Sequence, residues 1–158
     1  MDLKATPHAP SPVWPSAVSD ASQASLTIEN RLSELARVER WLADLMGRWA
    51  VSDRTVFAVD LVMNEAVTNV IDHAYSDNLT HQITITLANA PDGIVIGILN
   101  DGKAFNPFDA PQFEASEDLA QAPIGGRGIH LIKSYSVAHH YGRVAGRNHL
   151  TLVIPKVD

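Results

Sequence analysis

The sequence predicts an α+β fold, a two-layer sandwich in which helices cover a mixed, mostly antiparallel sheet. Two long segments with helical spacing of apolar residues precede most of the predicted strands. The remaining strands come in two pairs, and a short turn signal joins the members of each pair, which favours antiparallel pairing. With 158 residues, 46% of them hydrophobic, the chain has the size and composition of one domain with one core.

The first 24 residues predict a disordered tail. They contain four prolines, at positions 7, 10, 12 and 15, and many Ser and Ala residues. Such a segment offers little apolar surface to offset the entropy lost on ordering. We therefore expect the folded domain to occupy residues 25–158.

Two helices are predicted after a short alternating strand at Ser25–Glu29. Asn30 is expected to cap the first helix, which runs to about Ala50, and Ser52 is expected to cap the second, from Asp53 to about Tyr75. In both segments the apolar residues recur at helical spacing. These residues are Leu32, Leu35, Val38, Trp41, Leu42, Leu45, Met46 and Trp49 in the first helix, and Val56, Val59, Met63, Val67 and Val70 in the second.

The second half of the chain predicts two strand pairs separated by an irregular stretch and a short helix. The turn signal at residues 89–93 joins the first pair, and Gly146 lies between the strands of the second. A long irregular stretch inside a compact domain is typical of a functional lid or of a disordered segment. The predicted ranges are strands at 82–88 and 93–99, the irregular stretch at 106–126, a helix at 127–134, and strands at 136–143 and 148–155.

Charge and composition exclude several classes of ligand. The formal charge is −6 and Lys and Arg do not cluster, so no nucleic-acid partner is expected. Without cysteine the chain has neither disulfides nor thiolate metal ligands. The longest apolar run, Ile94–Leu99, is too short to cross a bilayer, and no signal peptide is evident at the N-terminus. We expect a cytoplasmic protein with no membrane partner.

Polar residues interrupt the second predicted helix at regular intervals. Glu65, Asn69 and His73 are spaced i, i+4 and i+8, which places them on one face, in otherwise mostly apolar surroundings. Buried polar groups need partners. One explanation is structural, a helix edge facing water or a neighbouring loop. The other is a hard cation such as Mg²⁺, which takes oxygen ligands and needs few protein groups when phosphates supply the rest.

Two further motifs follow along the chain. The first, NDGKAFNP at residues 100–107, comes where an apolar strand ends, and its Asp-Gly pair by itself indicates only a turn. The second, GGRGIHLIK at residues 125–133, is a glycine-rich entry into a helix, which either binds an anion such as phosphate or is a plain helix start. Neither the Walker phosphate loop nor the dinucleotide fingerprint is present.

Together NEAVTNVIDHA, NDGKAFNP and GGRGIHLIK resemble, in order and spacing, the N, G1 and G2 boxes of the GHKL ATPases. The Phe105-Asn106-Pro107 ending, the small size and the absence of a dimerisation-phosphotransfer domain look most like the anti-sigma-factor serine kinases of bacterial partner-switching systems. The resemblance extends from about Ser25 to Pro155. It implies the GHKL ATP-binding fold, with ATP and Mg²⁺ as cofactors.

The resemblance also implies roles for the polar face of the second helix. Asn69 would ligate the Mg²⁺ that bridges the ATP phosphates. Glu65 would orient or deprotonate an attacking serine hydroxyl, in keeping with the demands of phosphoryl transfer. His73 would lie near the nucleotide, although a capping or packing role is an equal alternative.

In the other two boxes the resemblance implies contacts with the nucleotide itself. Asn100 would accept a hydrogen bond from the adenine amino group, Gly102 would allow close approach to the adenine and Phe105 would form a wall of its pocket. Residues 109–125 would form a lid. The G2-box residues that would close over the nucleotide are Gly126, Arg127, Gly128 and Ile129.

The sequence departs from the family pattern at two positions. The G1 box usually begins with Asp, and here the position is Asn100, a neutral and therefore weaker acceptor. This difference bears on ATP affinity and on base selectivity. Ala104 stands where related sequences often have Pro, which bears on loop stiffness.

The leading hypothesis is a serine kinase that phosphorylates a STAS-type anti-sigma-factor antagonist and, in another complex, sequesters a sigma factor or other effector. A homodimer is expected, with the SLTIE strand and the first helix as contacts. The alternative, suggested by Asn100, is a non-catalytic partner-binding module. A third hypothesis is the ATP-binding half of a split histidine kinase.

The remaining histidines do not favour a metal site. His139 and His140 are consecutive on a predicted strand, so their side chains point to opposite faces of the sheet. We expect them, with His130 and His149, to be solvated surface residues.

Overall fold

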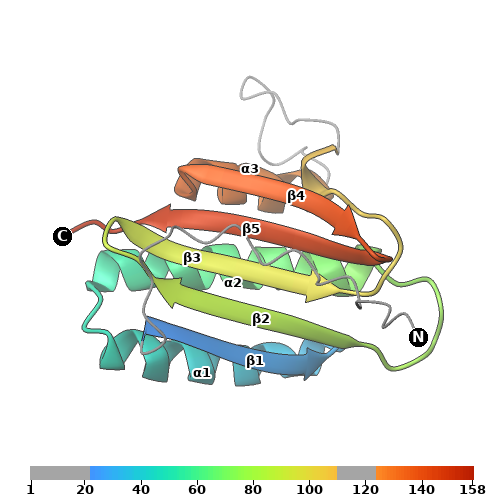
Figure 1. Cartoon of the computed structure of the whole chain (residues 1–158), viewed down its shortest axis with the longest axis horizontal. Helices are drawn as coiled ribbons and strands as arrows, with labels where there is room; N and C mark the ends of the chain where they lie inside the picture. The colour runs from blue at the N-terminus through green and yellow to red at the C-terminus, as the bar shows by residue number, and fades with distance from the viewer. Residues whose placement is uncertain (1–21, 110–123) are drawn as a thin grey trace, which may run out of the picture.

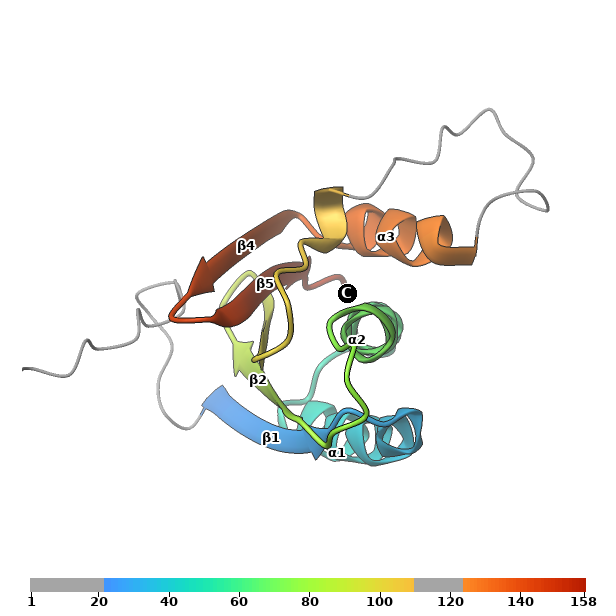
Figure 2. The same ribbon diagram turned by 90° about the vertical axis from the view of Figure 1, so that its right-hand side faces the viewer.

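The computed structural model describes residues 22–109 and 124–158. Three helices lie on one side of a curved five-stranded sheet, as the view along the strands in Figure 2 shows. This is the predicted α+β sandwich. Most of the predicted tail and of the predicted lid lies outside the described residues. The elements, in chain order, are β1 (Gln23–Glu29), η2 (Leu32–Glu34), α1 (Leu35–Arg48), α2 (Asp53–His73), β2 (Gln82–Asn89), β3 (Gly93–Asn100), η3 (Pro107–Asp109), α3 (Ile124–Tyr135), β4 (Ala138–Val144) and β5 (Arg147–Pro155).

The sheet has the strand order β1-β2-β3-β5-β4 (Figure 1). The predicted sheet was mixed and mostly antiparallel, and every ladder between the described strands is antiparallel. The register places Asn100 opposite Asn148, at the end of β3 and the start of β5. These two polar residues therefore meet at the end of the sheet where the NDGKAFNP motif begins.

A two-residue turn joins β4 to β5. Ala145 and Gly146 have φ values of 51° and 75°. Positive φ at both central residues is the requirement of a type I′ turn, whose twist matches that of the flanking strands. The predicted junction at Gly146 is confirmed.

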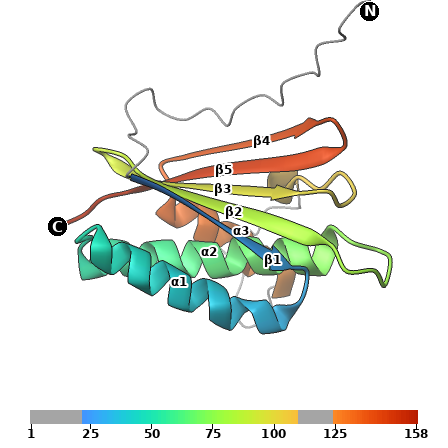
Figure 3. The same ribbon diagram turned by 60° about the horizontal axis from the view of Figure 1, so that its bottom comes forward.

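The core lies between the sheet and the helices. Helix α2 runs along the middle of the sheet with α1 beside it (Figure 3). The α2 residues that face the sheet are almost completely buried, and burying each such aliphatic side chain stabilises the fold by roughly 1.5–3 kcal/mol. They are Val59, Val62, Met63, Ala66, Val67 and Val70.

The two predicted helix caps differ in outcome. Ser52 caps α2, because its hydroxyl accepts a hydrogen bond from the backbone N–H of Thr55 at 3.3 Å. Asn30 does not cap α1, which begins at Leu35 after a short 3-10 turn. The Asn30 side chain instead accepts from the His81 backbone N–H at 2.8 Å. A long-range contact has thus replaced the local one that the sequence predicts.

The last helix begins earlier than expected. Helix α3 starts at Ile124, three residues before the predicted start, so the final residues of the predicted lid belong to this helix. In the described parts of the chain no helix is long and apolar enough to cross a membrane.

Candidate functional site

The polar face of α2 meets the glycine-rich start of α3. Glu65 and Asn69 are half-buried, and Gly128 of α3 lies directly against them. A Cβ atom added at Gly128 would overlap the Glu65 Oε2 atom and would lie 3.8 Å from the Asn69 Nδ2 atom. Glycine at this position is what allows α3 to approach the Glu65 carboxylate. The structure therefore brings the first and third motifs together.

Asn69 has an unusual environment for an amide. Its Nδ2 atom is buried and has no hydrogen-bond partner among the described residues. An unsatisfied buried polar group costs roughly 1–3 kcal/mol, so such a group at a cleft favours a ligand that completes its hydrogen bonds. The Asn69 amide oxygen and the neighbouring Glu65 carboxylate are hard oxygen donors, the kind that Mg²⁺ takes. These residues fit a magnesium and phosphate site.

A small pocket lies between α2 and the sheet, next to Asn69. It joins this residue to the start of the second motif, because Asn100 and Phe105 are both part of its wall. The Phe105 ring also contacts His73, with 5.4 Å between ring centroids. His73 itself is exposed at the end of α2. The residues that line the pocket are Ala66, Asn69, Val70, Asn100, Phe105, Pro107, Tyr141, Asn148 and Leu150.

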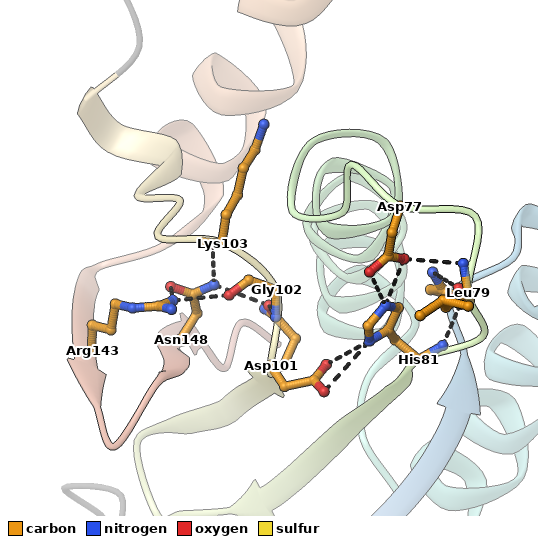
Figure 4. A network of polar contacts seen from close by, with 10 residues as sticks. Asp77, Leu79, His81, Asp101, Gly102, Lys103, Arg143 and Asn148 are labelled. Carbon is orange, nitrogen blue, oxygen red and sulfur yellow. Dashed lines mark hydrogen bonds and ion pairs between the residues drawn. The ribbon is translucent and has the colours of Figure 1, made fainter.

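Asn148 organises the polar end of this pocket. It is 2% exposed, and its Nδ2 atom donates to Asn100 Oδ1 at 3.0 Å and to the Lys103 carbonyl at 2.8 Å. Its Oδ1 atom accepts from Arg143 at 2.9 Å (Figure 4). The same oxygen accepts from the Tyr141 hydroxyl. One buried amide thus connects β3, β4, β5 and the loop after β3.

Sequence reasoning missed Asn148 as a site residue, although a signal was present. Positions 148, 150, 152 and 154 alternate along β5 and share one face of it. The last three are buried aliphatic residues, and Asn148 is the polar exception. A polar residue at the head of a buried apolar series indicates a required hydrogen-bonding partner.

Gly102 serves a packing role in this structure. A Cβ atom at Gly102 would overlap the Ala74 carbonyl oxygen and would lie 2.7 Å from the Ala74 Cβ atom. The next residue, Lys103, donates its backbone N–H to that carbonyl at 2.8 Å. The loop after β3 is therefore tied to the end of α2, which holds the second motif beside the first.

The other predicted G2-box residues lie in the first turns of α3. Gly126 is within the first turn, and the Arg127 side chain is exposed. Ile129 is 8% exposed and belongs to the hydrophobic core. Its side chain therefore fixes α3 onto the core, and any nucleotide contact of Ile129 is left to its backbone.

A second polar cluster, which the sequence did not predict, borders the loop before β2. The His81 ring lies between two carboxylates, with Nε2 2.7 Å from Asp77 Oδ1 and Nδ1 3.3 Å from Asp101 Oδ1 (Figure 4). The ring also stacks on Tyr75, with centroids 4.5 Å apart. Tyr75, Asp77 and His81 belong to the loop between α2 and β2, and the fold brings Asp101, which follows β3, to the same place. Among the described residues no group of three or more His, Asp or Glu side chains could hold a metal ion.

The carboxylates of this cluster shift its ionisation. The hydrogen bond with Asp77, followed by that with Asp101, raises the pKa of His81 above its ordinary value of 6.5. The hydrogen bond from His81 in turn lowers the pKa of Asp77 below 3.8. Burial, together with the Asp101 charge, raises the pKa of Tyr75, so this phenol stays neutral.

The His81 cluster predicts a pH-dependent contribution to stability. Because the pKa of His81 is raised in the folded state, its contribution is fully present below about pH 6.5 and is lost as the pH rises through the folded-state pKa. The contribution of Asp77 is present above about pH 3.8 and is lost below that value. We expect His81→Gln to lower the melting temperature at about pH 5.5 and to have much less effect at about pH 8.5. Equal effects of the substitution at both pH values would contradict this assignment.

Comparisons with known proteins agree with this geometry. Residues 28–154 match the family described as the histidine kinase-like ATPase domain. The chain is 30% identical over 137 residues to the serine/threonine-protein kinase BtrW of Bordetella bronchiseptica, covering 87% of this chain and 94% of the relative. It is 28% identical over 97 residues to the serine-protein kinase RsbW of Oceanobacillus iheyensis, covering 59% and 61% of the two chains.

A solved structure shows the same fold. The crystal structure of the RsbU and RsbW domains of Rv1364c from Mycobacterium tuberculosis superposes with a TM-score of 0.58 over 85% of this chain, at 12% identity. This chain spans 32% of that larger one. The matched family covers most of the sequence, including all three motifs around Glu65, Asn100 and Gly128. The chain therefore belongs to the histidine kinase-like ATPase domain family.

Proposed function

We propose that this chain is an ATP- and magnesium-dependent serine protein kinase of a partner-switching system. In this account it phosphorylates a STAS-type anti-sigma-factor antagonist and, in an alternative complex, sequesters a sigma factor or another effector protein. The observation that carries the proposal is the meeting of Glu65, Asn69 and Gly128 beside a pocket with an unpartnered buried amide. Two relatives whose names are those of serine or serine/threonine kinases support it.

Different residues of the chain have different roles in the proposed phosphoryl transfer. Asn69 would hold Mg²⁺ through its amide oxygen, and when bound the ion and ATP supply charge neutralisation and the phosphoryl group. The backbone N–H groups in the first turn of α3 would bind the phosphates of the nucleotide, because the N-terminus of a helix favours anions. Glu65 accepts the proton of the attacking serine hydroxyl, and the adjacent Gly128 leaves its carboxylate accessible. Asn100 and Phe105 would contact the purine ring of the nucleotide.

The proposed partners need an accessible surface. Strand β1 is at the edge of the sheet and pairs only with β2 among the described strands, and an edge strand is a common place for pairing with another chain. This supports a homodimer in which β1 and α1 make the contacts. A monomer mass in light scattering would contradict that arrangement.

Transfer of phosphate to a serine tests the proposal. The protein is incubated with ATP labelled at the γ-phosphate, Mg²⁺ and candidate STAS-type antagonists, and the product is mapped by mass spectrometry. The expected result is phosphoserine on one antagonist, formed only when Mg²⁺ is present. Absence of transfer to every candidate, from a protein that binds nucleotide, would favour the alternative of a non-catalytic binding module.

A substitution at Gly128 should lower the activity of the protein without lowering its stability. Gly128→Ala places a methyl group where the Glu65 carboxylate lies, so the carboxylate must move. Misplacing a catalytic group by about 1 Å can reduce a rate by about 100-fold, while Ala in place of Gly favours a helix by about 1 kcal/mol. We expect a large loss of phosphotransfer with an unchanged or raised melting temperature. A fall in stability that matches the loss of activity would contradict this role for Gly128.

A second candidate function, partner binding without catalysis, is favoured by one observation. The oxygen of Asn100, expected to accept from adenine, is already hydrogen-bonded to Gly102 and Asn148. If the chain worked by sequestration alone, partner binding would survive both Glu65→Gln and Asn69→Ala. Detection of phosphoserine would exclude this as a full account.

A further inference from the structure

The amide of Asn148 can adopt only one orientation. Its Nδ2 atom faces the Lys103 carbonyl at 2.8 Å, and a carbonyl can only accept. Its Oδ1 atom faces the Arg143 guanidinium at 2.9 Å and the Phe105 backbone N–H at 3.4 Å, which can only donate. Turning the amide over would therefore replace three hydrogen bonds by repulsive contacts.

The orientation of Asn148 fixes that of Asn100. The Asn148 Nδ2 atom and the Gly102 backbone N–H both donate to Asn100 Oδ1, each at 3.0 Å. With two donors on this side, the oxygen of Asn100 must face them. Asn100 is 4% exposed, so water does not offer a free alternative for these contacts.

The amino group of Asn100 is then the part left for a ligand. Within the described residues, no hydrogen bond joins Asn100 Nδ2 to another group, and Asn100 lines the pocket with Phe105 and Tyr141. The free space in this pocket is only about 10 Å³, so its walls must move to admit a base, which then meets a hydrogen-bond donor at Asn100. The 6-amino group of adenine is itself a donor, so adenine can accept from Asn100 only through a ring nitrogen, whereas the 6-oxo group of hypoxanthine and guanine is an acceptor.

We infer that Asn100 is a specificity-determining residue and that this pocket binds 6-oxo purine nucleotides at least as tightly as ATP. The inference rests on the proposed function, which places a purine nucleotide in this pocket. Its structural basis is the pair of interlocked amides, which holds the donor side of Asn100 toward the base. A site built around a hydrogen bond discriminates strongly against a ligand that cannot make it.

Replacing Asn100 by aspartate should reverse the preference. In Asn100→Asp one carboxylate oxygen can keep the hydrogen bonds from Gly102 and Asn148, and the second becomes an acceptor for the 6-amino group. The matched control is Asn64→Asp, which adds the same charge at an exposed position on α2. Circular dichroism verifies that both variants are folded.

The test is calorimetric titration of ATP and ITP, which differ at position 6 of the base and in the proton on N1, into the full chain with Mg²⁺. The expected result is that wild type and Asn64→Asp bind ITP at least as tightly as ATP, and that Asn100→Asp binds ATP about tenfold or more tightly than ITP. GTP should follow ITP in the wild type. The wild-type comparison decides the question even if Asn100→Asp does not fold.

Two outcomes would overturn the inference, and they differ in what they say about the proposed function. Tenfold tighter binding of ATP than of ITP by the wild type would overturn the inference and leave the kinase proposal standing. Failure of wild type and Asn100→Asp to bind any of the three nucleotides would overturn the proposed function and the inference together.

Discussion

Replacing Glu65 by glutamine is expected to reduce the rate of phosphate transfer to a serine by about 100- to 10,000-fold, the usual contribution of a general base. Glutamine retains the size of the side chain and its contact with Gly128 but cannot take the serine proton. Nucleotide binding should stay within a few-fold of wild type, because the substitution leaves Asn69 and the pocket unchanged. The measurement is a single-turnover assay with nucleotide in excess.

Asp60→Asn is the matched control for Glu65→Gln. It removes a carboxylate from the same helix, five residues earlier and on a different face. Transfer by this variant should equal that of wild type. A rate for Glu65→Gln within tenfold of the control would contradict the role of Glu65 as the base.

Replacing Asn148 by alanine is expected to lower the free energy of unfolding by about 3 kcal/mol, because it removes several hydrogen bonds and leaves buried partners unsatisfied. Asn100 would lose one of its two donors, and the Tyr141 hydroxyl and the Lys103 carbonyl would each lose Asn148 as a partner. Chemical denaturation monitored by circular dichroism measures the change.

Asn64→Ala provides the control for Asn148→Ala. Asn64 is exposed on α2, and its side chain makes only a 3.4 Å contact with Thr68 among the described residues. Its replacement should change stability by less than about 0.5 kcal/mol, as is usual for surface positions. Equal losses in the two variants would show that Asn148 does not organise this part of the fold.

The fold was predictable because its signals are periodic and local. Helical spacing located α1 and α2 to within a few residues of their ends, and the turn signals at residues 89–93 and at Gly146 located both hairpins. Asn30 shows the limit of such local reasoning. Its side chain bonds to His81, 51 residues away, and no pattern near Asn30 reports that contact.

The candidate site was predictable where residues share one element. The spacing of Glu65 and Asn69 alone places them on one face of a helix. The contact of Gly128 with these two residues depends on how α3 packs on α2. Before the structure, only the family resemblance indicated that packing. The catalytic and ligand-binding roles of these residues stay predictions.

Interactions between distant segments were not predictable. The locked amides of Asn100 and Asn148 depend on the register of β3 and β5, and the His81 cluster depends on the path of two loops. The Asn100–Asn148 contact joins residues 48 positions apart, and the His81 cluster adds the distant Asp101 to the local pair of Asp77 and His81. Their consequences for base preference and for pH dependence could be derived only from the folded chain.

The most direct test of the central claim is calorimetric titration of purine nucleoside triphosphate into the protein with and without Mg²⁺, beside Asn69→Ala and Asn64→Ala. We expect magnesium-dependent binding to wild type and to Asn64→Ala, and its loss in Asn69→Ala. Binding that is unaffected by Asn69→Ala or by removal of Mg²⁺ would contradict a magnesium-nucleotide site on this face of α2.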